Sequence, residues 1–222
     1  MDSLIDMESA RKLVSDRSLW PRVRDFLWDF APQVHASWLE GYPASAANST
    51  GRVKAWLLSQ LGVKAVFYPF EKGGFGRLLL LEGSVVLEIA KWLGALAFAG
   101  ELRKVTSGAA VKDLKAKLPG VYPDVFGYEL YFKGKGGKGK DKGTNLPDVP
   151  ECSFADRIIG AGCMMLQSNL KDIPEELQNR LRLKLPKSYA ELAPAFSDLD
   201  SNINLQLLLK LRFPEAYRLC CS

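Results

Sequence analysis

The sequence predicts a mainly helical α+β protein, a compact helical domain that carries one small β-hairpin. Of its 222 residues, 47% are hydrophobic, 10% aromatic and 25% charged, which are ordinary values for a folded globular protein. Apolar residues recur at helical spacing along most of the chain, and the best strand candidates lie together near residues 63–81. A chain of this length buries roughly 70% of its unfolded surface, enough for a core without disulfides or metals.

The first sixty residues favour short helices. Residues 8–19 and 20–30 both place apolar side chains at helical spacing around charged ones. A turn-rich segment follows, and its Ser49 or Thr50 suits the N-cap of a predicted helix over residues 51–61. The N-terminal part is therefore expected to be helical.

A β-hairpin is predicted near residues 63–81. Residues 63–70 (VKAVFYPF) and 77–81 (RLLLL) are the two strand candidates. The connecting EKGGFG contains three glycines, which permit a tight turn with positive φ angles.

The helix predicted over residues 83–100 is apolar around almost its whole circumference. A helix of this kind is covered on most sides, so we expect it to be the central buried helix. The longer apolar stretch 78–100 has the length of a membrane span, but it contains Glu82, Glu88 and Lys91. Each charge near a bilayer centre costs about 2.5–3.5 kcal/mol, which favours a buried core segment of a soluble protein.

Further helices are predicted in the second half of the chain. We expect them from Thr106 or Ser107 to Leu118, over residues 154–170, from Asp172 through Glu175-Glu176, and over residues 203–213. Residues 180–185 and 203–213 also alternate apolar and polar side chains as strands do. Leucine supplies nearly all their apolar positions and favours helices, so we predict helix for both. Residues 121–132 remain ambiguous between helix and strand.

Residues 133–150 form the clearest break in the pattern. We predict a flexible loop, rich in lysine and glycine, that separates residues 1–132 from a helical C-terminal part, 151–222, within a single globular domain, 1–222. Residues 133–143 contain five lysines and one aspartate, and so hold +4 of the net charge of +5. The basic composition therefore describes one loop and not a basic face.

Two nucleotide-binding patterns overlap in this loop. Gly134-x-Gly136-x-x-Gly139 matches the dinucleotide fingerprint, and Gly134-x4-Gly139-Lys140 begins like a P-loop. The fingerprint requires glycines that join a strand to a helix, whereas a proline-containing segment follows here. Asp141 stands where a P-loop has Ser or Thr for magnesium, and it would repel phosphate. We therefore predict a solvated loop and no cofactor.

The same lysines support an alternative function. The segment Lys133 to Lys142 would attract nucleic acid or an acidic partner in a salt-sensitive way. No aromatic residue lies between Lys133 and Gly143 to stack on bases, which argues against a specific nucleic-acid site. The alternative is thus a basic adaptor that holds nucleic acid or an acidic partner through this loop.

No catalytic or metal-binding set emerges from the sequence. His35 is the single histidine, so sites that need two histidines cannot be built, and we interpret it as a packed or surface residue. Cys152, Cys163, Cys220 and Cys221 contain no C-x-x-C pair, which favours a reduced, cytosolic protein. Cys163 lies mid-helix, where sulfur side chains fill a core. We expect no enzyme activity, metal or small-molecule substrate.

All five tryptophans lie in the first 92 residues: Trp20, Trp28, Trp38, Trp56 and Trp92. Most are expected in the core. Any that stay exposed would be interface anchors, because tryptophan is enriched in binding hot spots.

Several segments resemble one protein family. Residues 78–96 (LLLLEGSVVLEIAKWLGAL) resemble its leucine run, acidic-Gly turn and long helix, and a capped helix of the GAAVKDLKAKLPG kind follows. Residues 177–186 (LQNRLRLKLP) resemble its late arginine–leucine–proline element, and residues 207–222 (LLLKLRFPEAYRLCCS) resemble the end of some members. The family is the cytosolic accessory protein of type III secretion injectisomes, known as SctK or YscK/PscK, with OrgA and MxiK as distant relatives. The resemblance covers residues 78–132 and 151–222 well and residues 1–77 loosely.

The resemblance implies a non-enzymatic adaptor. Members belong to the sorting platform at the cytoplasmic side of the secretion machine, peripheral to its inner-membrane base. They link the cytoplasmic domain of the inner-membrane ring protein, SctD, to the pod protein, SctQ, which connects through the stator to the ATPase. The expected role is platform assembly and effector secretion, with membrane contact only through the ring and no nucleic-acid partner. No partner-binding residue follows from the resemblance.

Overall fold

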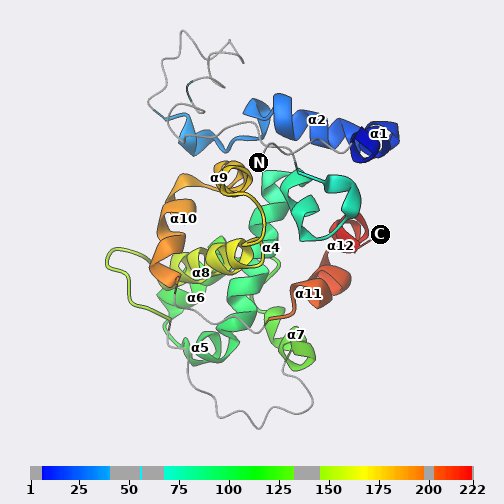
Figure 1. Cartoon of the computed structure of the whole chain (residues 1–222). Helices are drawn as coiled ribbons and strands as arrows, with labels where there is room; N and C mark the ends of the chain where they lie inside the picture. The colour runs from blue at the N-terminus through cyan, green and yellow to red at the C-terminus, as the bar shows by residue number, and fades with distance from the viewer. Residues whose placement is uncertain (1–6, 41–55, 57–67, 133–145, 198–202, 222) are drawn as a thin grey trace. The chain divides into compact units, whose positions relative to one another are not determined.

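The fold comes from a computed structural model, which describes residues 7–40, 56, 68–132, 146–197 and 203–221 (Figure 1). The regular elements in these residues are α-helices and 3-10 helices, and the described ranges contain no β-strand. The mainly helical class predicted from the sequence is confirmed, and the predicted β-hairpin is wrong.

The chain divides into two compact units, each built from several stretches. The first contains residues 1–86, 170–187 and 213–222, and the second contains residues 87–169 and 188–212. The chain passes from one unit to the other within α4 (Gly83–Ala97), after Asn169, within α10 (Lys187–Leu192) and after Arg212. The flexible loop 133–150 stays a prediction, because residues 133–145 lie outside the described residues. The single domain 1–222 also stays a prediction.

The first unit packs short helices around the leucine run. Its elements are α1 (Met7–Ser15), α2 (Trp20–Trp28), η1 (Ala31–Gln33), η2 (Ala36–Trp38), η4 (Phe70–Lys72), η5 (Phe75–Leu80), the first turn of α4, α9 (Glu175–Lys184) and α12 (Pro214–Cys221). The 3-10 helix η5 contacts α2, α9 and α12, and Figure 1 shows α12 beside it. The rings of Phe26 and Phe70 are fully buried and meet edge to face, with centroids 6.0 Å apart.

The predicted second strand, residues 77–81, is instead the 3-10 helix η5 and the residue that follows it. Residues 78–81 are all buried, whereas a half-exposed strand would expose every second side chain. Gly73 and Gly74 do adopt the positive φ angles expected of the turn, 74° and 87°. They lead into a helical turn because no partner strand pairs with residues 77–81 in the described chain. Residues 63–67 of the predicted first strand lie outside the described residues, as does most of the predicted helix 51–61.

Arg180 of α9 is a buried cation that holds the end of another helix. Its Nη1 donates to the carbonyl oxygens of Phe26 and Leu27, at 2.8 and 2.9 Å, in the last turn of α2. The guanidinium also lies over the rings of Phe26 and Phe30, 5.7 and 5.0 Å from their centroids. Burial lowers the pKa of Arg180. Carbonyl dipoles and aromatic faces therefore stand in for a counter-ion.

Lys184, one turn further along α9, is a second buried cation and binds the end of η5. Its Nζ donates to the carbonyl oxygens of Leu79 and Leu81, both at 2.7 Å, where η5 ends. The side chain is 3% exposed, and Nζ lies 5.1 Å from the ring centroid of Phe26. Burial lowers the pKa of Lys184 to about 7, against a smaller opposite effect of Glu82. The leucine run is thus fixed as a 3-10 helix by a residue about a hundred positions away.

The second unit contains the rest of α4 and most later helices. Its other elements are α5 (Ala99–Lys104), α6 (Gly108–Lys117), α7 (Val125–Phe132), α8 (Phe154–Ser168), residues 188–192 of α10, η6 (Ala193–Phe196) and α11 (Leu205–Arg212). The helix α8 contacts both α6 and η6, and Figure 1 shows α6 and α8 side by side. Its buried face includes Ile158, Ile159 and Cys163.

Two glycines let α4 and α8 approach backbone to backbone. A Cβ at Gly94 would collide with the carbonyl oxygen of Ile158, and one at Gly162 would collide with that of Ala90. Because backbone atoms cannot move aside as a flexible side chain does, both positions require glycine. This crossing forms the middle of the second unit's core.

A polar network joins α6, α8 and α10 in the second unit. Lys117 forms ion pairs with Asp156 at 2.6 Å and with Asp113 at 3.2 Å. Asp156 also accepts hydrogen bonds from Ser153 Oγ at 2.8 Å and from the hydroxyl of Tyr189 at 3.1 Å. Ser153 is the N-cap of α8 and accepts from the amide of Asp156, so the network closes the start of that helix.

Most predicted helices are confirmed. The buried helix expected over residues 83–100 is α4, which ends at Ala97, and α5 follows after Phe98. The ambiguous stretch 121–132 is helical from Val125, and residues 203–213 contain α11. The helix after Asp172 starts later than expected, because Pro174 is its N-cap. In the described part of the chain, none of the helices has the length and apolar character of a membrane span.

Candidate functional site

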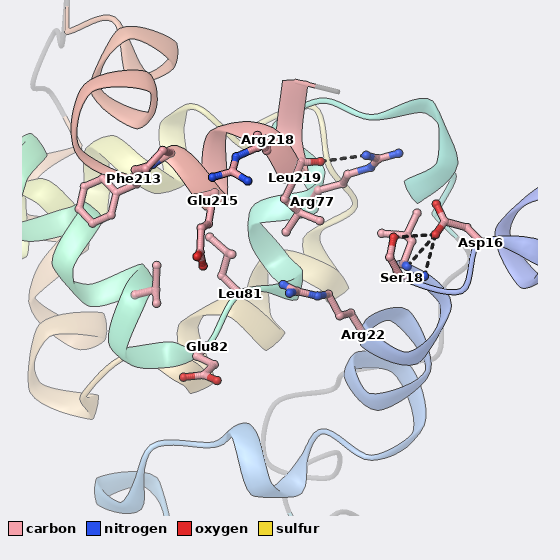
Figure 2. Close-up of a pocket in the computed structure, with 14 residues that line it drawn as sticks. Asp16, Ser18, Arg22, Arg77, Leu81, Glu82, Phe213, Glu215, Arg218 and Leu219 are labelled. Atoms are coloured by element: carbon pink, nitrogen blue, oxygen red, sulfur yellow. Dashed lines mark hydrogen bonds between the residues drawn. The ribbon is translucent and has the colours of Figure 1, made fainter.

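A cavity of about 740 Å³ opens in the first unit (Figure 2). It is lined by the turn before α2, by α2 itself, by η5 and the start of α4, and by α12 and the residue before it. The lining residues are Asp16, Ser18, Leu19, Arg22, Arg77, Leu81, Glu82, Val85, Phe213, Pro214, Glu215, Ala216, Arg218 and Leu219. We call this cavity the α12 groove. Three stretches that are far apart in the sequence therefore form one concave surface.

Arg77 ties the elements around the groove together. It is buried, and its Nε donates to the carbonyl oxygen of Phe70 at 2.7 Å. Its Nη1 donates to the carbonyl of Leu219 at 2.9 Å, as Figure 2 shows, and its Nη2 to that of Glu71 at 3.2 Å. Since Phe70 and Glu71 belong to η4 and Leu219 to the last turn of α12, one guanidinium fixes α12 against η4 and η5. Its role is to shape the groove.

The turn that carries Asp16 borders the groove and starts α2. The carboxylate of Asp16 accepts from the Ser18 hydroxyl at 2.7 Å and from the amides of Ser18 and Leu19 at 2.9 Å each. These hydrogen bonds, that from the Ser18 hydroxyl first, lower the pKa of Asp16. An ionised carboxylate near the N-terminus of α2 interacts favourably with the partial positive charge of the helix. Together with the local hydrogen bonds, this interaction holds the turn in place.

Four charged side chains around the groove lack an ion-pair partner among the described residues. They are Arg22, Glu82, Glu215 and Arg218, and all four are exposed. In Figure 2, Arg218 and Glu215 extend from α12 on one side, and Arg22 extends from α2 toward Leu81. These two positive and two negative groups line the groove together with apolar side chains such as Leu81, Val85 and Phe213. Such a surface provides apolar contact area together with charges that select and orient a partner.

His35 has a structural position and lies outside the groove lining. It is exposed and is the N-cap of η2, where Nδ1 accepts from the amide of Ser37 at 3.2 Å. Its own amide donates to the carbonyl of Leu183 at 2.8 Å. The interpretation of His35 as a packed or surface residue is consistent with this geometry.

The four cysteines are free thiols: Cys163 and Cys220 are buried, Cys152 is half-buried and Cys221 is exposed. Cys163 and Cys220 are buried, and burial raises the pKa of each thiol to about 12, so both are protonated at neutral pH. Cys163 lies within α8, as expected, and Met165 is buried with it. In the described ranges, no group of three or more His, Cys, Asp or Glu side chains is close enough to hold a metal ion.

The tryptophans follow the expected division only in part. Trp92 is buried, and Trp38 is half-buried with Nε1 donating to the carbonyl of Leu185 at 2.8 Å. Trp56 packs against the cluster around Phe30. Trp28 is 55% exposed and meets Trp20 edge to face at 5.8 Å between centroids. Under the hot-spot argument, Trp28 is the tryptophan that remains a candidate anchor.

The other residues singled out in the sequence do not line the groove. Glu175 and Glu176 occupy the first turn of α9, as predicted, where they face the positive end of the helix. Both nucleotide-binding patterns, Gly134 to Asp141, lie outside the described residues. None of the groove residues was predicted from the sequence. The one feature of the sequence that could have indicated the groove was Arg77, a charged residue next to a fully apolar run.

Within the lining, the Ser18 hydroxyl donates to the Asp16 carboxylate, whose lowered pKa makes it a weak base. These features define a helical protein with a concave surface lined by apolar and charged side chains. One family model matches residues 25–212 and is described as YOP proteins translocation protein K (YscK). The chain therefore belongs to the YscK family, whose members are structural or accessory proteins of type III secretion. Neither the curated proteins nor the solved structures gave a match.

Proposed function

We propose that this protein is a non-enzymatic cytoplasmic adaptor of a type III secretion injectisome. It links the cytoplasmic domain of the inner-membrane ring protein, SctD, to the pod protein of the sorting platform, SctQ, and is needed for platform assembly and effector secretion. The observation that carries this proposal is the family match over residues 25–212. The connection to the stator and the ATPase is indirect, through the pod protein, and contact with the membrane is indirect, through the ring.

The α12 groove is our candidate for one partner-binding surface. Its walls are held by Arg77 and by the Asp16 turn, so little ordering is needed when a partner binds. The exposed charges of Arg22 and Arg218 lack partners within the described chain and are available for a bound segment. An adaptor binds by shape and a few desolvated anchors, which is what a rigid groove with a charged rim provides.

Recovery of partners from the native bacterium tests the proposal. The tagged protein is purified after mild crosslinking, and the proteins that accompany it are identified by mass spectrometry. We expect the pod protein and the inner-ring protein. Recovery of metabolic enzymes or nucleic-acid-binding proteins in their place would contradict the adaptor role.

Charge reversals then test the groove. Arg22→Glu and Arg218→Glu are expected to reduce recovery of one of the two partners about tenfold or more, because each replaces a charge available to the bound segment with the opposite charge. Lys171→Glu is the matched control, since Lys171 is an exposed cation of the first unit outside the groove lining. Unchanged recovery of both partners by both groove variants would show that the partners bind elsewhere.

The alternative, a basic adaptor acting through Lys133 to Lys142, makes a different prediction. Replacing residues 133–143 with a neutral Gly/Ser linker removes a net charge of +4. If the sorting-platform role holds, partner recovery and secretion stay close to wild type. Loss of binding on this replacement, together with steep salt dependence of the wild type, would favour the alternative.

A further inference from the structure

The second unit exposes a patch that combines aromatic, aliphatic and cationic side chains. Tyr131 on α7 is 65% exposed and Leu211 on α11 is 39% exposed, two of the most exposed large apolar residues in the described chain. Tyr128 and Arg212 connect the two helices, because Arg212 Nη1 donates to the hydroxyl of Tyr128 at 3.1 Å. Figure 1 shows α7 and α11 next to each other. We call these four residues the α7–α11 patch.

Arg212 is held in place by aromatic rings. Its guanidinium carbon lies 4.4 Å from the ring centroid of Trp92 and 5.1 Å from that of Tyr128. The rings of Trp92 and Tyr128 meet edge to face at 5.3 Å, and Tyr131 continues the row at 6.3 Å from Tyr128. A guanidinium that lies on aromatic faces keeps its in-plane N–H donors for a planar acceptor. The arginine is therefore oriented before any partner arrives.

The patch has an unbalanced positive charge. Arg212 and the exposed Lys210 have no carboxylate partner in the part of the chain that the structure describes. The one acidic residue of α7, Glu129, is buried and pairs with Arg103 at 2.6 Å. The helix α11 contains no acidic residue. A carboxylate from another molecule would supply the charge that these helices lack.

We propose that the α7–α11 patch binds an acidic segment of a partner protein, with a carboxylate on Arg212 and an apolar side chain against Tyr131 or Leu211. The proposal rests on the adaptor function, because linking two proteins requires a second surface besides the α12 groove. A peptide is favoured over nucleic acid as the occupant. Only Tyr131 presents a largely exposed ring, whereas Trp92 is 3% exposed, so the patch lacks the row of open rings on which bases stack.

Peptide display on the full-length protein tests the chemistry of the occupant. A phage-displayed library of random 12-residue peptides is selected on the wild type, with counter-selection on Tyr131→Ala. We expect the selected peptides to be enriched in Asp or Glu beside an aliphatic or aromatic residue. Basic peptides, or peptides without acidic enrichment, would overturn the proposal. Tight binding of a 20-nucleotide single-stranded DNA probe that competes with the selected peptides would also overturn the proposal.

Variants then place the peptide on the patch. A synthetic selected peptide is expected to lose affinity about tenfold or more with Tyr131→Ala, Leu211→Ala and Arg212→Met. Arg212→Lys keeps the charge without the planar donors and should recover affinity only partly. Val14→Ala, which removes a similarly exposed apolar residue of the first unit, should bind as the wild type does. Equal thermal melting of all variants excludes unfolding, and unchanged affinity of the three patch variants would refute the assignment.

Failure of this proposal differs from failure of the adaptor function. If the wild type recovers both partners from cells and the patch variants do so equally well, the adaptor function stands and the patch assignment is wrong. If the wild type recovers neither partner, the adaptor function itself fails, whatever the peptides show.

Discussion

Three cations are buried in the first unit and donate to backbone carbonyls. Within the described residues, Arg77, Arg180 and Lys184 have no carboxylate partner, and the carbonyls they bind include those at the ends of α12, α2 and η5. Helix C-termini carry partial negative charge, so these cations neutralise several helix ends and tie distant parts of the chain together. Lys184 is the most informative of the three, because its charge state changes near neutral pH.

We predict that Lys184 makes stability depend on pH above neutrality. Its pKa is about 7 in the folded protein and 10.5 in the reference state, so between these values only the unfolded chain binds the proton. Stability therefore rises by about 1.4 kcal/mol per pH unit between these two values, and this gain is lost as pH falls through 7. Urea unfolding from pH 6 to 9 should show this rise in the wild type but not in Lys184→Met.

The difference between the two proteins isolates Lys184. Cys163 and Cys220, whose pKa values are raised to about 12, lower stability at alkaline pH equally in both. Identical pH profiles for wild type and Lys184→Met would show that Lys184 does not titrate in this range.

A second residue-scale prediction concerns Asp156. Burial raises its pKa, but the hydrogen bonds from Lys117 and Ser153 outweigh that effect and lower it overall. The carboxylate thus contributes stability above its unfolded pKa, near 3.8, which is lost as pH falls through the folded value. Lys117→Met should be less stable than wild type at pH 7, and the gap should shrink toward pH 3, measured by urea unfolding at each pH.

The control for this variant is Lys115→Met, an exposed lysine on the same helix with no ion pair in the described chain. We expect it to match wild type at both pH values. A gap between wild type and Lys117→Met that does not change with pH would assign the effect to packing instead of charge.

At the scale of elements, the crossing of α4 and α8 organises the second unit. The Cα atoms of Gly94 and Gly162 lie against carbonyls of the opposite helix, so the helix spacing depends on both glycines. In the sequence, Gly94 is only one small residue in an apolar helix. What makes it essential is α8, which approaches it from more than sixty residues away.

We predict that Gly162→Ala lowers the free energy of unfolding by about 2–3 kcal/mol, because the added methyl group forces two backbones apart. Gly127→Ala is the matched control. Gly127 lies in α7, a Cβ there meets nothing within 4 Å, and alanine should stabilise the helix by about 0.5–1 kcal/mol. Chemical denaturation measures both. A Gly162→Ala protein as stable as wild type would mean that the helices can separate at little cost.

At the scale of the whole molecule, each compact unit contains chain from both sides of residues 133–150. The first unit takes residues 1–86 together with 170–187 and 213–222, and the second takes 87–132 together with later segments. A cut between residues 133 and 142 therefore divides both units without removing an element from either.

We predict that brief trypsin treatment cuts first within Lys133 to Lys142, where five lysines lie among glycines, and that the two fragments stay associated. Gel electrophoresis should show two fragments, while size-exclusion chromatography shows one peak at the mass of the intact protein. Separation of the fragments without denaturant would contradict the interleaved arrangement. Early cutting throughout the chain would contradict the packed units.

Helix existence could be predicted from the sequence with good success because periodicity is a local property. The apolar residues of 83–97 and 154–168 repeat at helical spacing, and α4 and α8 form there. The family also follows from sequence pattern, through segments such as residues 78–96 and 177–186, and the family match over 25–212 confirms it.

The leucine run, the two units and both candidate surfaces were decided only by tertiary structure. Residues 77–81 have a strand-like composition. Lys184 nevertheless donates hydrogen bonds to the carbonyl oxygens of Leu79 and Leu81, and these bonds stabilise the 3-10 helix. The α12 groove joins Arg22, Arg77 and Arg218, and the α7–α11 patch joins Tyr128 and Arg212, across separations of 55 to more than 140 residues. A sequence alone determines what each segment favours locally, whereas the contacts that bury a charge or expose a ring form between segments that local patterns do not relate.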